Sequence, residues 1–210
     1  MTRSDARRPT GSRDAIFEVA TRRFSEVGYG STTIRDIADE VGILPGSLYA
    51  HITSKEALLH EIIDSGIERF IASAREAIES DEPAGERLRL AVRRHLAVVG
   101  ESPARTMVVF HLWRQLTGDF RSRILGKRQQ YEDIFTQLVE DGMKSGCFNA
   151  GISPRIAVLA ILGALNWSAE WYSPSGPATP EQVGESMADY LILGLLSREA
   201  AADNGADARV

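Results

Sequence analysis

Apolar residues recur every three or four positions along most of the chain, and this spacing predicts helices rather than strands. The first such stripe consists of Ile16, Ala20, Phe24 and Val27. It stops at Gly28 and Gly30, where glycine supplies the left-handed conformation that often ends a helix. No stretch alternates apolar and polar residues over the length of a strand between turn signals. The sequence therefore predicts an all-α protein.

A second helix is predicted to begin after Thr32 or Thr33, either of which can cap it. Asp36 lies three residues after Thr33, as in a capping box with aspartate in place of glutamate. Gly42 ends this helix after about two turns. Its buried face is predicted to consist of Ile34, Ile37, Ala38 and Val41.

Two further helices follow closely. Leu44, Leu48 and Ile52 step by four residues and predict a short third helix. Thr53 to Glu56 reads as a capping box, so a fourth helix is predicted to begin at Thr53 and to run to about Ser80. Helices are then predicted over 84–100, 104–117, 120–145, 153–172 and 180–197, and the small, polar tail 200–210 is predicted to be disordered.

Charge is distributed unevenly along the 210 residues. The chain carries a net charge of -5, but residues 1–60 hold eight basic and eight acidic side chains and are neutral. Arg3, Arg7, Arg8 and Arg13 crowd the very start. A small neutral domain with a basic arm is compatible with nucleic-acid binding, because such binding depends on local positive charge.

Composition also limits the surroundings of the chain. The start has no apolar core of the signal-peptide kind, and the single Cys147 cannot form an internal disulfide, so we expect a cytoplasmic protein. The apolar run from Ile156 to Ala169 is shorter than the roughly 20 residues of a membrane span. It predicts a buried helix and no membrane partner.

The segment from Thr33 to Lys55 places two short helices around a tight turn at Gly42, with a third helix before them. In a trihelical unit of this kind the last helix can lie in the major groove of DNA. The spacing leaves Pro45, Gly46, Ser47 and Tyr49 facing outward, and Gly46 allows close approach of the backbone. His51 and Lys55 can reach phosphates, and Thr32 and Thr33 lie at a helix N-terminus that favours an anion.

These residues resemble the TetR family of bacterial repressors. The matching positions are Thr32, Thr33, Ile37, Ala38, Gly42, Gly46, Leu48, Tyr49, His51, Ser54, Lys55, Glu56 and Leu58. The departures are Val41, Leu44 and Ile52, where the family pattern has alanine, serine and phenylalanine. Leu44 removes a capping hydroxyl from the recognition helix. The resemblance implies that Tyr49 and Lys55 hold DNA phosphates and that residues 44–49 meet base edges.

The predicted DNA-binding residues are Thr32, Thr33, Leu44, Pro45, Gly46, Ser47, Tyr49, His51 and Lys55. A merely structural three-helix bundle is the alternative for the whole segment. For any single residue the alternative is a contact to phosphate or sugar, which receive half or more of protein–DNA hydrogen bonds. The N-terminal arginines can enter a minor groove, lie on phosphates or stay solvated.

The C-terminal part is rich in aromatic residues that share helix faces with polar groups, as a ligand pocket does. In the TetR family the pocket lies among the middle helices, and the resemblance suggests Phe110, Trp113, Tyr131, Phe135, Asn166 and Trp167 as ligand-binding residues. Ordinary core packing is the alternative for each aromatic residue. The helices 153–172 and 180–197 are expected to form a homodimer interface, with an all-protein core as the alternative use of the same residues.

The segment from Asn166 to Pro180 also resembles actinobacterial TetR-type repressors of fatty-acid and steroid breakdown, which respond to CoA thioesters. The basic cluster Arg121, Arg123, Lys127 and Arg128 could meet the CoA phosphates, and a solvated helix face is the alternative. No catalytic, metal or cofactor motif accompanies these residues: the four histidines lack an H-E-x-x-H spacing, and the only glycine-rich turn lacks its third glycine.

The sequence thus predicts no enzyme and no cofactor. It predicts a helix-turn-helix DNA-binding domain over 1–53 and a helical ligand-binding and dimerisation domain over 54–199. The expected function is a dimeric transcriptional repressor that binds a palindromic double-stranded operator. A small-molecule effector, an acyl-CoA or another hydrophobic metabolite, would release it. A transcriptional activator of the same fold, or a drug-responsive repressor of an efflux pump, is the alternative.

Overall fold

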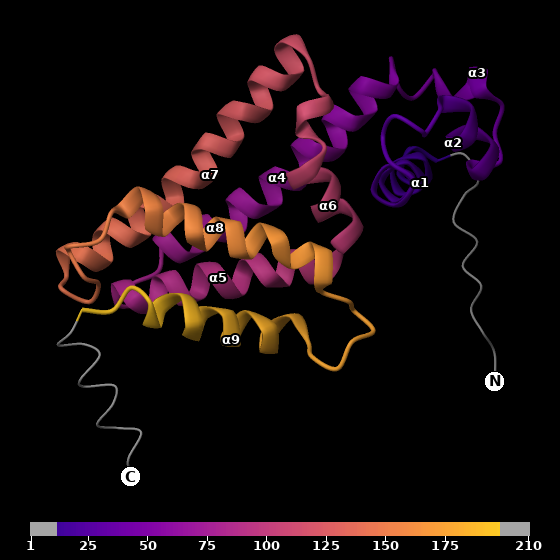
Figure 1. Cartoon of the computed structure of the whole chain (residues 1–210). Helices are drawn as coiled ribbons and strands as arrows, with labels where there is room; N and C mark the ends of the chain where they lie inside the picture. The colour runs from indigo at the N-terminus through magenta and orange to yellow at the C-terminus, as the bar shows by residue number, and fades with distance from the viewer. Residues whose placement is uncertain (1–11, 198–210) are drawn as a thin grey trace. The chain divides into compact units, whose positions relative to one another are not determined.

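The computed structural model describes residues 12–197, and all regular elements in this range are helical apart from one antiparallel bridge between Phe148 and Leu196. The all-α prediction is thereby confirmed. Arg3, Arg7, Arg8 and the tail 200–210 lie outside the described residues. The elements in chain order (Figure 1) are α1 Arg13–Glu26, α2 Ile34–Val41, α3 Pro45–Leu48, α4 Lys55–Ile78, α5 Ala84–Glu101, α6 Pro103–His111, the 3-10 helix η1 Trp113–Gln115, α7 Gly118–Lys144, α8 Pro154–Trp171 and α9 Pro180–Leu193.

The chain folds into two compact units. The first comprises the residues up to Gly66 together with Ala104–Ile124, and the second comprises Ile67–Pro103 and the residues from Leu125 on. Helices α4 and α7 therefore each supply residues to both units. The predicted division into 1–53 and 54–199 cuts the chain only once. It does not assign Ala104–Ile124, the returning stretch, to the first unit, because helix periodicity does not say which helices pack together.

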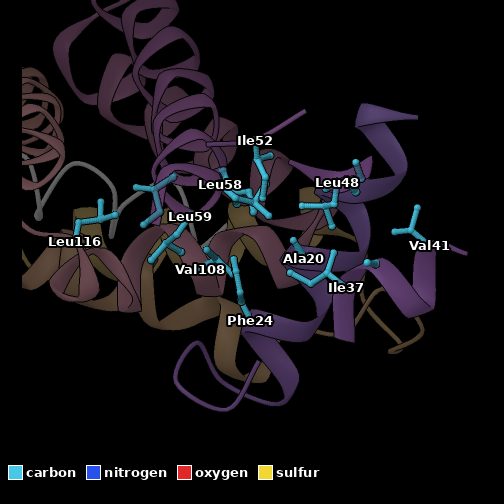
Figure 2. Close-up of a cluster of buried hydrophobic side chains, with 14 of the residues drawn as sticks. Ala20, Phe24, Ile37, Val41, Leu48, Ile52, Leu58, Leu59, Val108 and Leu116 are labelled. Carbon is cyan, nitrogen blue, oxygen red and sulfur yellow. The ribbon is translucent and has the colours of Figure 1, made fainter. Parts of the chain in front are cut away.

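The first unit has a hydrophobic core to which six helices contribute. Ile16, Ala20 and Phe24 are buried as predicted, whereas Val27 is half exposed because it lies at the C-cap of α1. Figure 2 shows part of this cluster of side chains. Its buried members are Ile16, Ala20, Phe24, Ile37, Ala38, Val41, Leu48, Ile52, Leu58, Leu59, Ile62, Ile63, Val108, Leu116 and Ile124. The last three come from the returning stretch, so this stretch completes the core.

Capping residues explain where α2 and α4 begin. Thr33 caps α2 with the predicted capping box: its hydroxyl accepts from the Asp36 amide at 3.1 Å, and its own amide donates to the Asp36 carboxylate at 2.8 Å. Gly42 ends α2 at φ +80°. The prediction for α4 was wrong by two residues, because Ser54 and not Thr53 accepts from the third amide along, that of Ala57.

Helix α5 is the central element of the second unit and packs against α8 and α9 (Figure 1). Arg89 on α5 donates to both Glu185 and Asp189 on α9 at 2.6 Å. Gly184 allows the close approach of the two helices, since a Cβ there would lie 3.1 Å from the Cα of Arg93. The small residue and the paired charges together fix α9 along α5.

Two predicted helix ends differ from the structure. The helix predicted over 104–117 ends at His111, and the tighter turn η1 then brings Leu116 into the core of the first unit. The helix predicted over 180–197 ends at Leu193. Beyond it the carbonyl of Leu195 accepts from the Asn149 amide at 2.8 Å, so this carbonyl bonds to a distant segment of the same chain and not within a helix. No helix within residues 12–197 is long and apolar enough to cross a lipid bilayer.

Candidate nucleic-acid interface

The recognition segment, residues 44–49, is held by one buried side chain and otherwise faces solvent. Helix α3 has only four residues, and its Leu48 is fully buried in the core of the first unit. Around this anchor Leu44, Gly46, Ser47 and Tyr49 are exposed and Pro45 is half-buried, and His51 just beyond the segment is exposed too. The outward placement predicted for Gly46, Ser47 and Tyr49 agrees with the structure. The segment can therefore meet a partner without disturbing the core.

Leu44 is exposed, although it stands four residues before the buried Leu48. It is the N-cap residue of α3, with extended backbone angles, and its side chain is 76% exposed. Its carbonyl accepts from the Ser47 amide at 2.9 Å, while its side chain makes no capping bond. An N-cap residue lies outside the helical geometry, so a spacing of four residues does not place it on the same face as Leu48 and Ile52.

The two threonines before α2 have different surroundings. Thr32 is fully buried, and its hydroxyl donates to the carbonyl of Gly28 at 2.9 Å. Thr33 is exposed at the N-terminus of α2, and its hydroxyl is bonded to Asp36. These hydrogen bonds lower the pKa of Asp36, so the capping carboxylate stays ionised. Of the two residues, only Thr33 is placed to reach a ligand.

Lys55 has a structural role that its motif position did not reveal. Its ammonium group donates to the carbonyls of Tyr29 and Thr32, each at 2.9 Å, and lies 4.3 Å from the centre of the Tyr29 ring. These bonds tie the start of α4 to the loop between α1 and α2. An ammonium has three donors, so one of the three is left over for a phosphate.

Glutamate also holds this unit together. Glu56, which the sequence placed in a capping box, instead accepts from the amide of Thr117 at 2.6 Å and from its hydroxyl at 2.9 Å. Arg22 and Arg23 of α1 both bond to Glu40 of α2, the second at 2.8 Å. The acidic side chains of the first unit are thus partly neutralised by internal pairs.

Arg35 is an exposed basic residue that was not among the predicted DNA-binding residues. It lies in the first turn of α2, its side chain is 83% exposed, and the nearest ion-pair contact is a 4.0 Å approach to Asp39. A basic residue on the polar face of the helix that precedes the recognition helix is the signal that could have identified it. Its position beside Thr33 makes it a further candidate for a phosphate contact.

The residues suggested for ligand binding are divided between the two units. Phe110 is buried and Trp113 partly buried in the first unit, where the guanidinium groups of Arg114 and Arg121 lie 4.8 and 5.6 Å from the Trp113 ring. Tyr131, Phe135, Asn166 and Trp167 belong to the second unit. Trp167 is 58% exposed on α8, whereas Tyr131 and Phe135 are buried.

Tyr131 belongs to a buried aromatic cluster that also contains Phe70, His95 and Phe135. The ring centres of Tyr131 and Phe135 lie 5.2 Å apart, and those of Phe70 and His95 lie 4.8 Å apart. Nδ1 of His95 lies 2.7 Å from the Tyr131 hydroxyl, and Nε2 lies 3.1 Å from the Leu165 carbonyl. A carbonyl only accepts, so Nε2 carries the proton and Nδ1 accepts from Tyr131.

Burial decides the charge state of this pair. It lowers the pKa of His95 to about 3, although the hydrogen bond to the Leu165 carbonyl acts in the opposite direction, and it raises the pKa of Tyr131. Both groups are therefore neutral at physiological pH. On the adjoining turn of α8, Asn166 Oδ1 and Ser168 Oγ are buried without a hydrogen-bond partner among residues 12–197. His95 and Ser168 were not predicted from the sequence as site residues.

The basic cluster on α7 is partly engaged. Lys127 pairs with Glu68 at 2.7 Å, and the Arg121 guanidinium lies over Trp113. Arg123 is exposed and Arg128 is half-buried. The four side chains are consequently not one uniform solvated face.

Comparison with known proteins agrees with this architecture. Residues 16–62 match the family model described as bacterial regulatory proteins, tetR family, and residues 81–195 match the tetracyclin repressor-like C-terminal domain. The first match includes the recognition segment, and the two together cover more than half of the chain.

Similar proteins are regulators too. The HTH-type transcriptional repressor KstR2 of Mycobacterium tuberculosis is 29% identical over 188 residues, which cover 89% of this chain and 94% of that protein. The structure of the ketosteroid transcriptional regulator KstR2 has a TM-score of 0.84 at 27% identity and covers 91% of this chain and 100% of that one. The structure of AibR in complex with isovaleryl coenzyme A and operator DNA has a TM-score of 0.75 at 26% identity. The match covers 88% of this chain and 97% of AibR. The chain belongs to the TetR family of bacterial transcriptional regulators.

Proposed function

We propose that this protein is a ligand-responsive repressor that binds a palindromic operator as a homodimer. The observation that carries the proposal is the recognition segment, which presents Leu44, Ser47 and Tyr49 to solvent around the single buried anchor Leu48. Two such segments in a dimer must fall on successive major-groove faces, about 34–36 Å apart. An effector that binds another dimer geometry more tightly would shift the population away from this spacing.

DNA binding is tested with Tyr49, whose exposed hydroxyl is proposed to donate to a phosphate. Replacing Tyr49 by Ala is expected to weaken binding to a selected operator at least about 10-fold for each half-site, since a hydrogen bond to a charged group contributes roughly 1.5–3 kcal/mol. Fluorescence anisotropy at several salt concentrations measures the effect, and the wild-type affinity should fall as salt rises. Lys55 is unsuitable for this test because its substitution would release the loop bonds to Tyr29 and Thr32.

The matched control is Leu125→Ala, which alters an exposed apolar residue of α7 that lies outside the recognition segment. It should bind the operator as the wild type does. If the wild-type protein selected no sequence from random duplex DNA at low salt, the proposed function would be wrong. If the Tyr49 and Leu125 variants bound equally well, Tyr49 would have no role in binding.

The homodimer is proposed to form through α8 and α9. Helix α8 presents an exposed apolar stripe that contains Ile156, Leu159, Trp167 and Trp171, and α9 adds Tyr190 and Leu193. Six large apolar side chains that are 47–78% exposed on two helices of one unit exceed the scattered apolar surface of a monomer. Ile156 and Leu159 lie three positions apart, Trp167 and Trp171 lie four apart, and the exposed Gly163 stands between the two pairs, so one face of α8 forms a strip that a second copy can cover.

The effector is proposed to bind in the second unit, beside the cluster of Tyr131, Phe135 and His95. Two features support this placement: the apolar and aromatic surroundings, and the buried, unbonded Asn166 Oδ1 and Ser168 Oγ on α8. A pocket with few polar groups in an apolar lining suits a hydrophobic ligand. AibR is a relative in complex with isovaleryl coenzyme A, so we propose an acyl-CoA. Arg128, which is half-buried on α7 in the same unit, is the candidate phosphate partner.

Isothermal titration with a panel of acyl-CoAs and the corresponding free acids tests the effector class. An acyl-CoA is expected to bind and to release operator DNA, and Asn166→Leu should weaken its binding about 10-fold by removing one hydrogen-bonding group. Asn149→Leu, an exposed residue between α7 and α8, is the matched control. Absence of binding by every CoA thioester would contradict the proposed ligand class while leaving operator binding untouched.

A further inference from the structure

Leu44 is one of the most exposed large apolar side chains of the described residues, and it lies in the segment that faces a partner. Only 24% of its surface is covered, and its side chain makes no capping hydrogen bond. Serine, threonine, aspartate or asparagine at an N-cap would contribute about 1 kcal/mol through that bond. A smaller polar residue would therefore stabilise the start of α3 better than this leucine does.

The surroundings of Leu44 leave room for another molecule. Leu44 is 76% exposed, and a Cβ built on Gly46, two positions along, would meet no atom within 4 Å, so the surface is open at both positions. Leu48 is buried and Pro45 is half-buried, which fixes the backbone from which Leu44 projects. The leucine is thus an exposed apolar side chain at the N-terminal end of the recognition helix, the end that contacts base edges in helix-turn-helix proteins.

The chemistry of the major groove specifies what such a side chain can recognise. Leucine has no hydrogen-bonding group, and the base edges in the groove are donors and acceptors with one exception, the C5 methyl group of thymine. We propose that Leu44 determines specificity by packing on a thymine methyl in each operator half-site. This inference rests on the proposed operator binding and adds the kind of base that one residue selects.

The test removes the methyl group and nothing else. After an operator has been selected from random duplexes with the wild-type protein, each thymine in turn is replaced by deoxyuridine, and affinities are measured for the wild type and for Leu44→Ala. One thymine per half-site should prove sensitive. Its replacement is expected to weaken wild-type binding about 4-fold in one half-site and about 15-fold in both, the equivalent of one buried methyl group each. The Leu44→Ala protein should not distinguish thymine from deoxyuridine there.

Two controls keep the outcomes separate. Leu44→Ser restores a capping hydroxyl, so it should melt no lower than the wild type and yet lose the discrimination, which excludes misfolding as the cause. Tyr49→Phe should retain the discrimination at reduced overall affinity. If deoxyuridine weakened the wild type and Leu44→Ala equally at every position, or at none, the inference would be overturned although operator binding stood. If no duplex were selected at all, the proposed function itself would fail.

Discussion

Replacing Leu159 by glutamate is expected to dissociate the proposed dimer and to weaken operator binding about 100-fold or more. Leu159 is 47% exposed within the apolar stripe of α8, so a carboxylate there is tolerated by the isolated chain. In the dimer the same carboxylate would be buried without a partner, which costs several kcal/mol. Loss of the second subunit removes the effective concentration of the second recognition helix, a factor of about 10²–10⁴. Sedimentation velocity and anisotropy measure the two effects.

Leu125→Glu is the matched control for this substitution. Leu125 is also a leucine of the second unit, is 43% exposed and lies on α7, outside the stripe. This variant should sediment and bind DNA as the wild type does. A monomeric wild type, or a dimer that persists in Leu159→Glu, would show that α8 and α9 do not form the interface.

Lowering the pH from 6.5 to 4.5 is expected to reduce the free energy of unfolding by about 2 kcal/mol through His95 alone. Burial lowers the pKa of His95 from 6.5 to about 3 in the folded protein. Below pH 6.5 the unfolded chain takes up a proton that the folded chain does not, so stability falls with pH at about 1.4 kcal/mol per unit. The loss continues to about pH 3, and above about pH 7.5 this contribution is constant. Urea unfolding at a series of pH values measures it.

His95→Gln separates this contribution from those of the carboxylates. Glutamine can accept from Tyr131 or donate to the Leu165 carbonyl but does not titrate. The variant should be less stable than the wild type at pH 7, and the two stability curves should converge as the pH falls. Parallel curves between pH 6.5 and 4.5 would mean that His95 is protonated in the folded state, contrary to its buried surroundings.

Much of the first unit could be predicted from the sequence, because its signals are local. The capping box at Thr33, the left-handed Gly42 and the buried Leu48 each depend on residues a few positions apart. The prediction was wrong where one residue can serve two partners. Glu56 fits a capping box in the sequence but bonds to Thr117, which lies 61 positions away. Lys55 likewise bonds to backbone carbonyls that a motif pattern does not include.

The second unit was harder to predict for the same reason. His95, Tyr131 and Leu165 come from three helices, and no spacing in the sequence indicates that they meet. Trp167 could be assigned to a ligand site or to a core with equal ease, because a tryptophan on an apolar helix is compatible with both. Its exposure of 58% suits the proposed subunit contact better. Which face of an apolar helix is covered depends on tertiary packing, and periodicity does not reveal it.

The first unit is built from two separate stretches of the chain, so its core cannot be completed until both have been synthesised. Val108, Leu116 and Ile124 complete the core around Leu58 and Leu59, and all three follow the second unit's α5 in the chain. A nascent polypeptide therefore cannot finish its DNA-reading end until residue 124 has left the ribosome, by which time α5 is already synthesised. A chimera that transplants only the first 66 residues would lack the part of this core that residues 104–124 supply. The first unit can therefore be exchanged between proteins intact only if both stretches are transferred together.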